Sequence, residues 1–129
     1  MRLIGDFFEV LETSVIEAGF ITTIELNPRH IVYSGHFPGH PVTPGVIQVQ
    51  IVHELLEKHF SRKLRLKTME QCKFLKILNP NDTPKIAVHI EFNEKEELVS
   101  VKAWGEHGQE TYFKLNATYH VIPPSLGQD

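Results

Sequence analysis

The residues best suited to chemistry lie in a loop rich in proline and glycine and at the start of the helix that follows it. His36 can take up a proton near neutral pH. Thr43 and Pro44 favour a helix start, with the threonine hydroxyl as N-cap and proline at the first helical position. If Thr43 caps the N–H of Val46, the N–H of Gly45 points outward at the positive end of the helix dipole. Because glycine has no side chain, a ligand carbonyl can approach that N–H closely, as an oxyanion site requires.

The helix is expected over about residues 44–60, and apolar side chains cover most of its circumference, which predicts a buried helix. One polar stripe interrupts them, formed by Gln50, His53, Glu54 and Glu57 at helical spacing. For Glu54 and Glu57 a solvent-facing position is the preferred interpretation. The alternative is that the stripe begins inside a cleft near Gln50.

Strand patterns surround this helix. Apolar and polar residues alternate over 85–92 and 110–121, which indicates strands with one buried face. Further strands are expected over residues 7–13, 19–26, 71–77 and 98–104. Residues 14–18, 79–82, 93–97 and 105–109 are the expected connections. Consecutive strands with short turns predict an α+β domain with an antiparallel sheet.

Composition limits the function classes. The chain has 129 residues, 41% of them hydrophobic and 22% charged, as expected for one globular domain over residues 1–129. A net charge of −3 without a basic run argues against a nucleic-acid partner. The single cysteine, Cys72, excludes an internal disulfide, and no signal peptide or membrane span is apparent, so a cytoplasmic protein without a membrane partner is expected. The tail from about residue 123 is polar and is expected to fray.

The stretch GHFPGHPVTPGVIQVQ (Gly35 to Gln50) resembles the signature of the β-hydroxyacyl-(acyl carrier protein) dehydratases of fatty-acid synthesis. KFLKILNPNDT (Lys73 to Thr83) resembles the strand and turn that follow the helix in that family. The resemblance covers nearly the whole chain and implies a hot-dog fold, in which an antiparallel sheet wraps around one long central helix. It also implies a 3-hydroxyacyl substrate held as a thioester on a phosphopantetheine arm.

The resemblance assigns roles to single residues. His36 corresponds to the base that takes the C2 proton, and the Gly45 N–H to the donor that stabilises the developing enolate charge. Phe37, Pro44 and Val46 are the expected substrate-binding neighbours, although Phe37 also fits a buried packing role. His40 is expected at the rim, where a basic group can meet a phosphate. The loop spacing of His36 and His40 is not helical and no third ligand is evident, so no metal or cofactor is expected.

The family's third catalytic group is an acid fourteen positions after the histidine, and this chain has Gln50 there. An amide cannot donate an acidic proton, and a positioned acid typically contributes about 10²–10⁴-fold to the rate. Three compensations are open. First, Glu54, one turn further along the helix, can act through Gln50 or a water. Second, His36 can return the C2 proton to the hydroxyl, while Gln50 only holds that hydroxyl in place. Third, a partner chain can supply the acid.

Three functions therefore stay open. The first is a 3-hydroxyacyl-thioester dehydratase of fatty-acid or related lipid or polyketide-type biosynthesis. The second is a hot-dog thioesterase that uses Glu54 to activate water or attack the thioester. The third is a catalytically silent dehydratase partner or acyl-binding module. A pure binding module has no need of His36 or of an open Gly45 N–H, so the dehydratase class is preferred.

The resemblance also implies partners. Hot-dog protomers usually pair by joining their sheets, so at least a homodimer or a trimer of dimers is expected, or a heteromer with a related hot-dog subunit. The acyl carrier is expected to be acyl carrier protein or coenzyme A.

Overall fold

The computed structural model describes residues 2–34 and 39–124 of the chain. Strands β1 (Phe8–Ile16) and β2 (Gly19–Leu26) precede a short 3-10 helix, η1 (Ile31–Tyr33), and the long helix α1 (Gly45–Phe60). The strands β3 (Leu64–Phe74), β4 (Lys85–Lys95), β5 (Leu98–His107) and β6 (Glu110–Val121) follow. The expected α+β architecture is confirmed, with the helix beginning at Gly45 rather than at residue 44.

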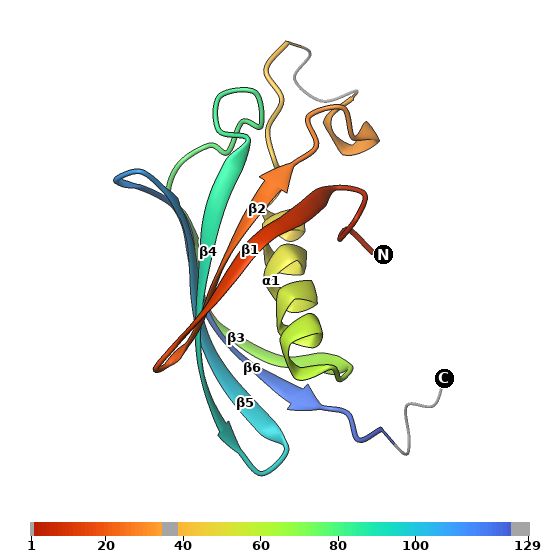
Figure 1. Cartoon of the computed structure of the whole chain (residues 1–129), viewed down its shortest axis with the longest axis vertical. Coiled ribbons are helices and arrows are strands. Elements are labelled where there is room, and N and C mark those ends of the chain that lie inside the picture. The colour runs from red at the N-terminus through yellow and green to blue at the C-terminus, as the bar shows by residue number, and fades with distance from the viewer. Residues whose placement is uncertain (1, 35–38, 125–129) are drawn as a thin grey trace.

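All strands join one antiparallel sheet in the order β1-β2-β4-β5-β6-β3. Figure 1 shows that this sheet curves around α1, which lies along its concave side. The hairpin turns are tighter than the sequence suggested, because the strands continue further than expected and leave only residues 17–18, 96–97 and 108–109 as turns. Glu96 and Gly108 have positive φ angles of 60° and 61°, as such tight hairpins require.

The core lies between the sheet and one side of α1. The helix buries Ile51, Val52, Leu55 and Leu56, each no more than 2% exposed. Full burial of such a side chain stabilises the fold by about 1.5–3 kcal/mol. The alternation that predicted one buried face on β4 and β6 is confirmed, since the inward-facing residues of both strands are buried: Ile86, Val88, Ile90, Phe113, Leu115, Ala117 and Tyr119.

Two sequence predictions about these elements are wrong. Strand β3 begins at Leu64 rather than at residue 71, because irregularities in its pairing with β6, between Leu66 and Thr68 and between Met69 and Gln71, interrupt the alternation. The helix is not buried all round either, because Val46 is 73% exposed.

Strands β1 and β3 form the two edges of the sheet. Edge strand β1 has an irregularity between Val10 and Glu12 and exposed acidic side chains, features that discourage pairing with another chain. Both edge strands also expose large apolar side chains: β1 exposes 46% of Leu11 and 79% of Val15, and β3 exposes 41% of Leu66 and 50% of Phe74.

Candidate active site

The start of α1 is held differently from the sequence prediction. Pro44 is the N-cap residue, and no side chain caps the first turn. The Thr43 hydroxyl lies instead 2.7 Å from the hydroxyl of Tyr33, in a buried pair. The predicted Thr43 cap on Val46 is therefore wrong, because Thr43 lies one residue too early and its hydroxyl is already engaged. Burial raises the pKa of Tyr33 to about 12, an effect that the hydrogen bond with Thr43 partly offsets.

The backbone N–H of Gly45 has no hydrogen-bond acceptor among residues 2–34 and 39–124. It lies in the first turn of α1, where the helix dipole favours negative charge. The absence of a side chain here has a cause that the sequence did not reveal. A Cβ atom on Gly45 would come within 2.6 Å of Phe74 Cζ, so the ring of Phe74 occupies the space beside the Gly45 Cα.

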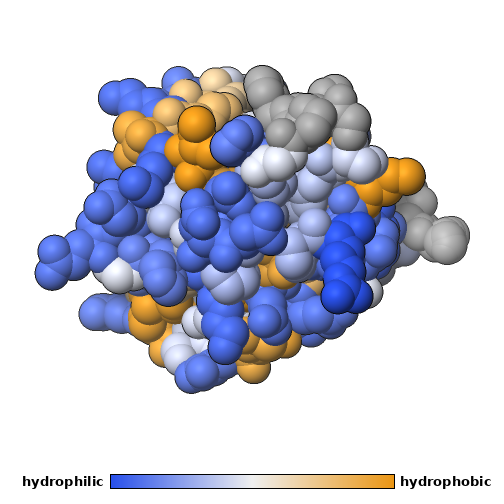
Figure 2. Space-filling model, turned by 90° about the horizontal axis from the view of Figure 1, so that it is seen from above, coloured by the Kyte–Doolittle hydropathy of each residue, from blue (hydrophilic) through white to orange (hydrophobic). Residues whose placement is uncertain are grey.

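A cavity of about 320 Å³ lies beside this helix start and is lined by Pro44, Gly45, Gln48 and Phe74, among others. Gln48 is only 3% exposed; its amide nitrogen donates to the Thr43 carbonyl at 3.0 Å, and its oxygen Oε1 has no partner within the described part of the chain. Figure 2 looks down on this end of the molecule and shows hydrophobic residues in separate groups among hydrophilic ones. The expected neighbours Pro44 and Gly45 therefore line one cavity, whereas Val46 is not among its lining residues and is exposed.

Glu54 is buried, and the prediction of a solvent-facing position for it is wrong. The N-terminal segment covers it, because its carboxylate accepts hydrogen bonds from the backbone N–H groups of Leu3, at 3.0 and 2.8 Å, and of Ile4, at 2.8 Å. Gln50 Nε2 donates a further hydrogen bond of 2.9 Å to Glu54 Oε2. Glu54 is 4% exposed, and both of its oxygens are engaged.

These contacts determine the orientation of the Gln50 side chain. A carboxylate only accepts hydrogen bonds, so the amide nitrogen of Gln50 must face Glu54. The carbonyl oxygen of the same amide is consequently directed away from Glu54. That oxygen can only accept a hydrogen bond, whereas an acid in the neutral state could donate one.

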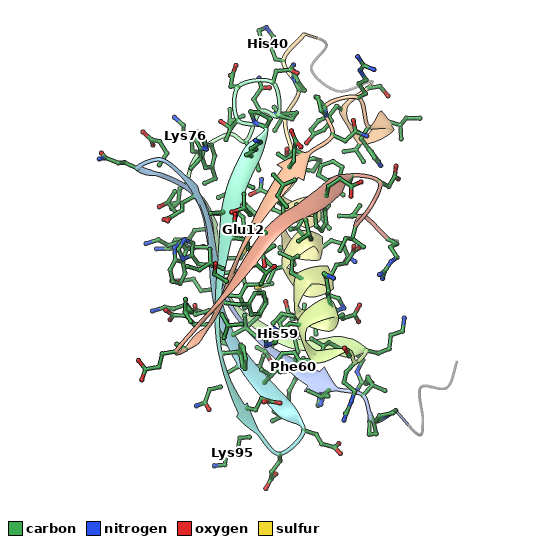
Figure 3. All side chains as sticks on the ribbon, in the orientation of Figure 1. Glu12, His40, His59, Phe60, Lys76 and Lys95 are labelled. Atoms are coloured by element: carbon green, nitrogen blue, oxygen red, sulfur yellow. The ribbon has the colours of Figure 1, made fainter. Side chains whose placement is uncertain are left out.

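The remaining predicted site residues lie in or beside the loop before the helix. His36 and Phe37 lie outside the described residues. His40 is exposed, and Figure 3 places it at the end of the molecule that also carries Lys76, far from His59 and Phe60 at the other end of α1. Lys76 is also exposed and lines the cavity beside Gly45. Both Lys76 and Phe74 lie in the stretch Lys73 to Thr83 that carries part of the family resemblance, but sequence analysis assigned neither residue to the site.

Within residues 2–34 and 39–124, no three histidine, cysteine or acidic side chains come close enough together to hold a metal ion. In the same ranges, no helix has both the length and the apolar character needed to cross a membrane.

The family model that matches this chain and two of its curated relatives are all dehydratases. The ApeI-like family, described as ApeI dehydratase, matches residues 13–112. A 3-hydroxyacyl-[acyl-carrier-protein] dehydratase FabZ from Lactobacillus helveticus is 30% identical over 99 residues, which are 71% of this chain and 66% of the relative. The FabZ of Clostridium acetobutylicum is 29% identical over 66 residues, 46% of this chain and 47% of that protein. The chain thus spans about half to two thirds of the length of these curated relatives.

Solved structures establish the fold. The dehydratase heterocomplex ApeI:P from Xenorhabdus doucetiae superimposes with a TM-score of 0.69 at 19% identity, covering 87% of this chain and 96% of that one. The BH2602 protein from Bacillus halodurans, solved with CoA, superimposes with a TM-score of 0.59 at 12% identity, covering 87% and 74%. The central helix in a curved antiparallel sheet is therefore the hot-dog fold, as expected.

Proposed function

Because this chain belongs to the ApeI-like dehydratase family, we propose that it removes water from a 3-hydroxyacyl thioester to give the 2-enoyl thioester. The observation that supports this most directly is the Gly45 N–H, which has no acceptor among the described residues and lies beside a cavity at the start of α1. A thioester carbonyl bound there would place its developing negative charge at the positive end of the helix.

The first step proposed is removal of the C2 proton by His36. The C2–H bond breaks, its electron pair moves toward the thioester carbonyl, and the oxygen gains charge that the Gly45 N–H stabilises. Removing one such donor from an enzyme typically costs about 10²–10³ in kcat. A module that only bound acyl chains would gain nothing from this pairing of base and donor.

The second step is departure of the 3-hydroxyl group. With Gln50 Nε2 held by Glu54, the Gln50 carbonyl oxygen is suited to accept a hydrogen bond from the substrate hydroxyl and to hold it in place. Gln50 cannot give that hydroxyl a proton. Direct donation by Glu54 is disfavoured, because its oxygens already accept hydrogen bonds from Leu3, Ile4 and Gln50. The proton must come from His36, from another side chain of this chain or from a partner subunit.

The same contacts weigh against a thioesterase that uses Glu54. A carboxylate that attacks a thioester or activates water needs an oxygen open to the substrate. Glu54 is 4% exposed, and it binds the backbone of the N-terminal segment. We therefore assign Glu54 a positioning role toward Gln50 rather than a catalytic one.

The acyl carrier is proposed to be acyl carrier protein or coenzyme A, both of which bear a phosphate on the pantetheine arm. Exposed basic side chains lie at the end of the molecule where α1 begins, namely His40 and Lys76 (Figure 3). A phosphate that approached the cavity beside Gly45 would meet Lys76, which lines it.

We propose that the β3 edge joins a second copy of this chain or a related hot-dog subunit. This strand has no neighbour on one side, and it exposes Leu66 and Phe74. Its last residue, Phe74, also lines the cavity beside Gly45, so a subunit paired with β3 would lie close to that cavity. One of the similar structures is itself a dehydratase heterocomplex.

The test is to incubate the chain, alone and with any co-purifying hot-dog subunit, with 3-hydroxybutyryl and crotonyl thioesters of coenzyme A and acyl carrier protein. Dehydration, hydration and hydrolysis are followed for the wild type and for His36→Ala, Gln50→Glu and Glu54→Gln. We expect reversible dehydration that His36→Ala abolishes. Hydrolysis lost only in Glu54→Gln would favour the thioesterase. An inactive wild type that Gln50→Glu activates would identify a silent partner.

A further inference from the structure

We infer that His53, held by Glu57, is a second acid–base group of this site and delivers the proton that residue 50 cannot give. This inference rests on the proposed dehydratase function and names the residue that replaces the missing acid. His53 lies three positions after Gln50 on α1, and neither family resemblance nor composition assigned it a role.

The His53 ring contacts Glu57 on the same helix and Tyr119 on β6, and Glu57 is in turn held by β3. Its Nε2 lies 3.1 Å from Glu57 Oε2, and the same oxygen accepts the backbone N–H of Leu64 at 2.9 Å. Leu64 begins β3, so Glu57 is itself anchored to the sheet. The rings of His53 and Tyr119, which lies on β6, pack edge to face. Their centroids are 5.5 Å apart, and the interplanar angle is 71°.

This environment differs from that of an ordinary surface pair at i,i+4 spacing, which is solvated and stabilises a helix by about 0.2–0.5 kcal/mol. The side chains of His53 and Glu57 are only 21% and 19% exposed. A carboxylate that holds one nitrogen of a histidine, and so fixes its tautomer and orientation, is the arrangement that acid–base histidines use. In the described part of the chain, the titratable groups in direct contact with the ring are Glu57 and Tyr119.

The position of His53 also suits the reaction. Residues three apart on a helix face the same side, with Cβ atoms about 5–6 Å apart, so His53 neighbours Gln50. Since Nε2 faces Glu57, Nδ1 is the nitrogen that can turn toward a substrate hydroxyl, directly or through one water. Both residues are half-buried, so neither is closed off from a bound substrate.

The proton balance closes without a co-reactant. His36 takes the C2 proton, the C2–C3 double bond forms, and the C3–O bond breaks. The departing oxygen takes a proton from His53 Nδ1 and leaves as water, while Gln50 has held the hydroxyl in position. His36 is then protonated and His53 neutral, and exchange with solvent restores both. The reverse sequence hydrates the enoyl thioester.

The test combines His53→Asn with Gln50→Glu, which restores a carboxyl group at the family's usual position. The matched control is His59→Asn, a histidine on the same helix that is exposed and takes no part in the proposed chemistry. Steady-state dehydration of 3-hydroxybutyryl thioester is measured across pH for the wild type, both single histidine variants, Gln50→Glu and the double variant, and thermal unfolding reports whether each variant is folded.

We expect His53→Asn to lower kcat by about 10²–10⁴-fold with little change in KM, and His59→Asn to have no effect. Adding Gln50→Glu to His53→Asn should restore the rate by about tenfold or more, because a carboxyl group at position 50, which the neighbouring Glu54 carboxylate helps to keep protonated, can give the departing hydroxyl its proton. A purely structural role for His53 would not allow this rescue.

The outcomes separate the two proposals. An active wild type whose kcat is unchanged by His53→Asn overturns the assignment of His53 alone. A loss of rate that Gln50→Glu fails to restore in a folded double variant also overturns it, since the effect would then be structural. A wild type without dehydration in any carrier or assembly overturns the proposed function, and the role of His53 falls with it.

Discussion

The side-chain amide of Gln50 donates a hydrogen bond of 2.9 Å to Glu54 Oε2, and Glu54 in turn holds the backbone of Leu3 and Ile4. One buried carboxylate thus joins the N-terminal segment to the residue at the family's acid position. The orientation of Gln50 therefore depends on a segment that lies about fifty positions earlier in the chain.

Glu54→Gln is expected to weaken both connections. An amide has one acceptor oxygen, so one group of N–H donors loses its partner, and we expect the free energy of unfolding to fall by about 2 kcal/mol. The Gln50 amide also loses its fixed direction, which should lower the dehydration rate by roughly ten- to a hundredfold. Urea unfolding and the dehydration assay measure the two effects. The control is Glu12→Gln on the exposed face of β1, and equal stability of the two variants would contradict this account.

Gly45→Ala tests the contact with Phe74. The added Cβ would lie 2.6 Å from Phe74 Cζ, so either the half-exposed ring or the helix start must shift, at a cost of about 1–2 kcal/mol in unfolding free energy. In a Phe74→Ala background the same change should cost little, because the obstructing ring is gone. Urea unfolding of the four proteins of this double-mutant cycle gives the coupling. Equal costs of Gly45→Ala in both backgrounds would show that the two residues do not restrict one another.

Tyr119→Phe is expected to leave stability at neutral pH unchanged or slightly higher. Tyr119 is 0% exposed, and its hydroxyl has no hydrogen-bond partner among the residues described, so its removal leaves nothing unsatisfied. Tyr112→Phe is the matched comparison, because the Tyr112 hydroxyl lies 2.9 Å from the Thr83 hydroxyl, and its loss should cost about 1 kcal/mol. A larger loss in Tyr119→Phe than in Tyr112→Phe, measured by urea unfolding, would mean that the Tyr119 hydroxyl has a partner.

The same residue predicts how stability changes at alkaline pH. Burial, with a smaller contribution from Cys72, raises the pKa of Tyr119 to about 12, whereas a tyrosine in an unfolded chain has a pKa of about 10. The folded state thus prefers the protonated phenol, and its contribution is complete below pH 10 and is lost as the pH rises to 12. A difference of about two pKa units corresponds to about 3 kcal/mol over the whole range. Unfolding at pH 9 and pH 11.5 should show a smaller fall for Tyr119→Phe, and equal falls would argue against a raised pKa.

The sequence predicted the architecture where its patterns were regular. Alternation over β4 and β6 identified their buried residues, and the apolar run identified α1. The prediction was wrong for the start of β3, because irregular pairing near Thr68 and Gln71 interrupts the alternation. The predicted helix cap was also wrong, because the Thr43 hydroxyl pairs with the Tyr33 hydroxyl instead of capping the helix. These failures have local physical causes that a periodic pattern does not contain.

Parts of the candidate site depend on contacts between distant segments, which one sequence does not reveal. The burial of Glu54 requires Leu3 and Ile4, and the space beside Gly45 is filled by Phe74 from another element. The pair of His53 and Glu57 is different, because its i,i+4 spacing is visible in the sequence. The hydrogen bond by which Leu64, the first residue of β3, holds Glu57 could not be predicted from the sequence.

The most direct test of the central claim is the uptake of deuterium at C2 of a 3-hydroxyacyl thioester during incubation in heavy water, measured by mass spectrometry before conversion is complete. If His36 deprotonates C2 while the Gly45 N–H stabilises the charge on the carbonyl oxygen, the wild type should place deuterium at C2 well above the uncatalysed background. His36→Ala should abolish the uptake, while Gln50→Ala, which lacks only the hold on the hydroxyl, should retain part of it. Background uptake by the wild type, or uptake that survives His36→Ala, would contradict the account.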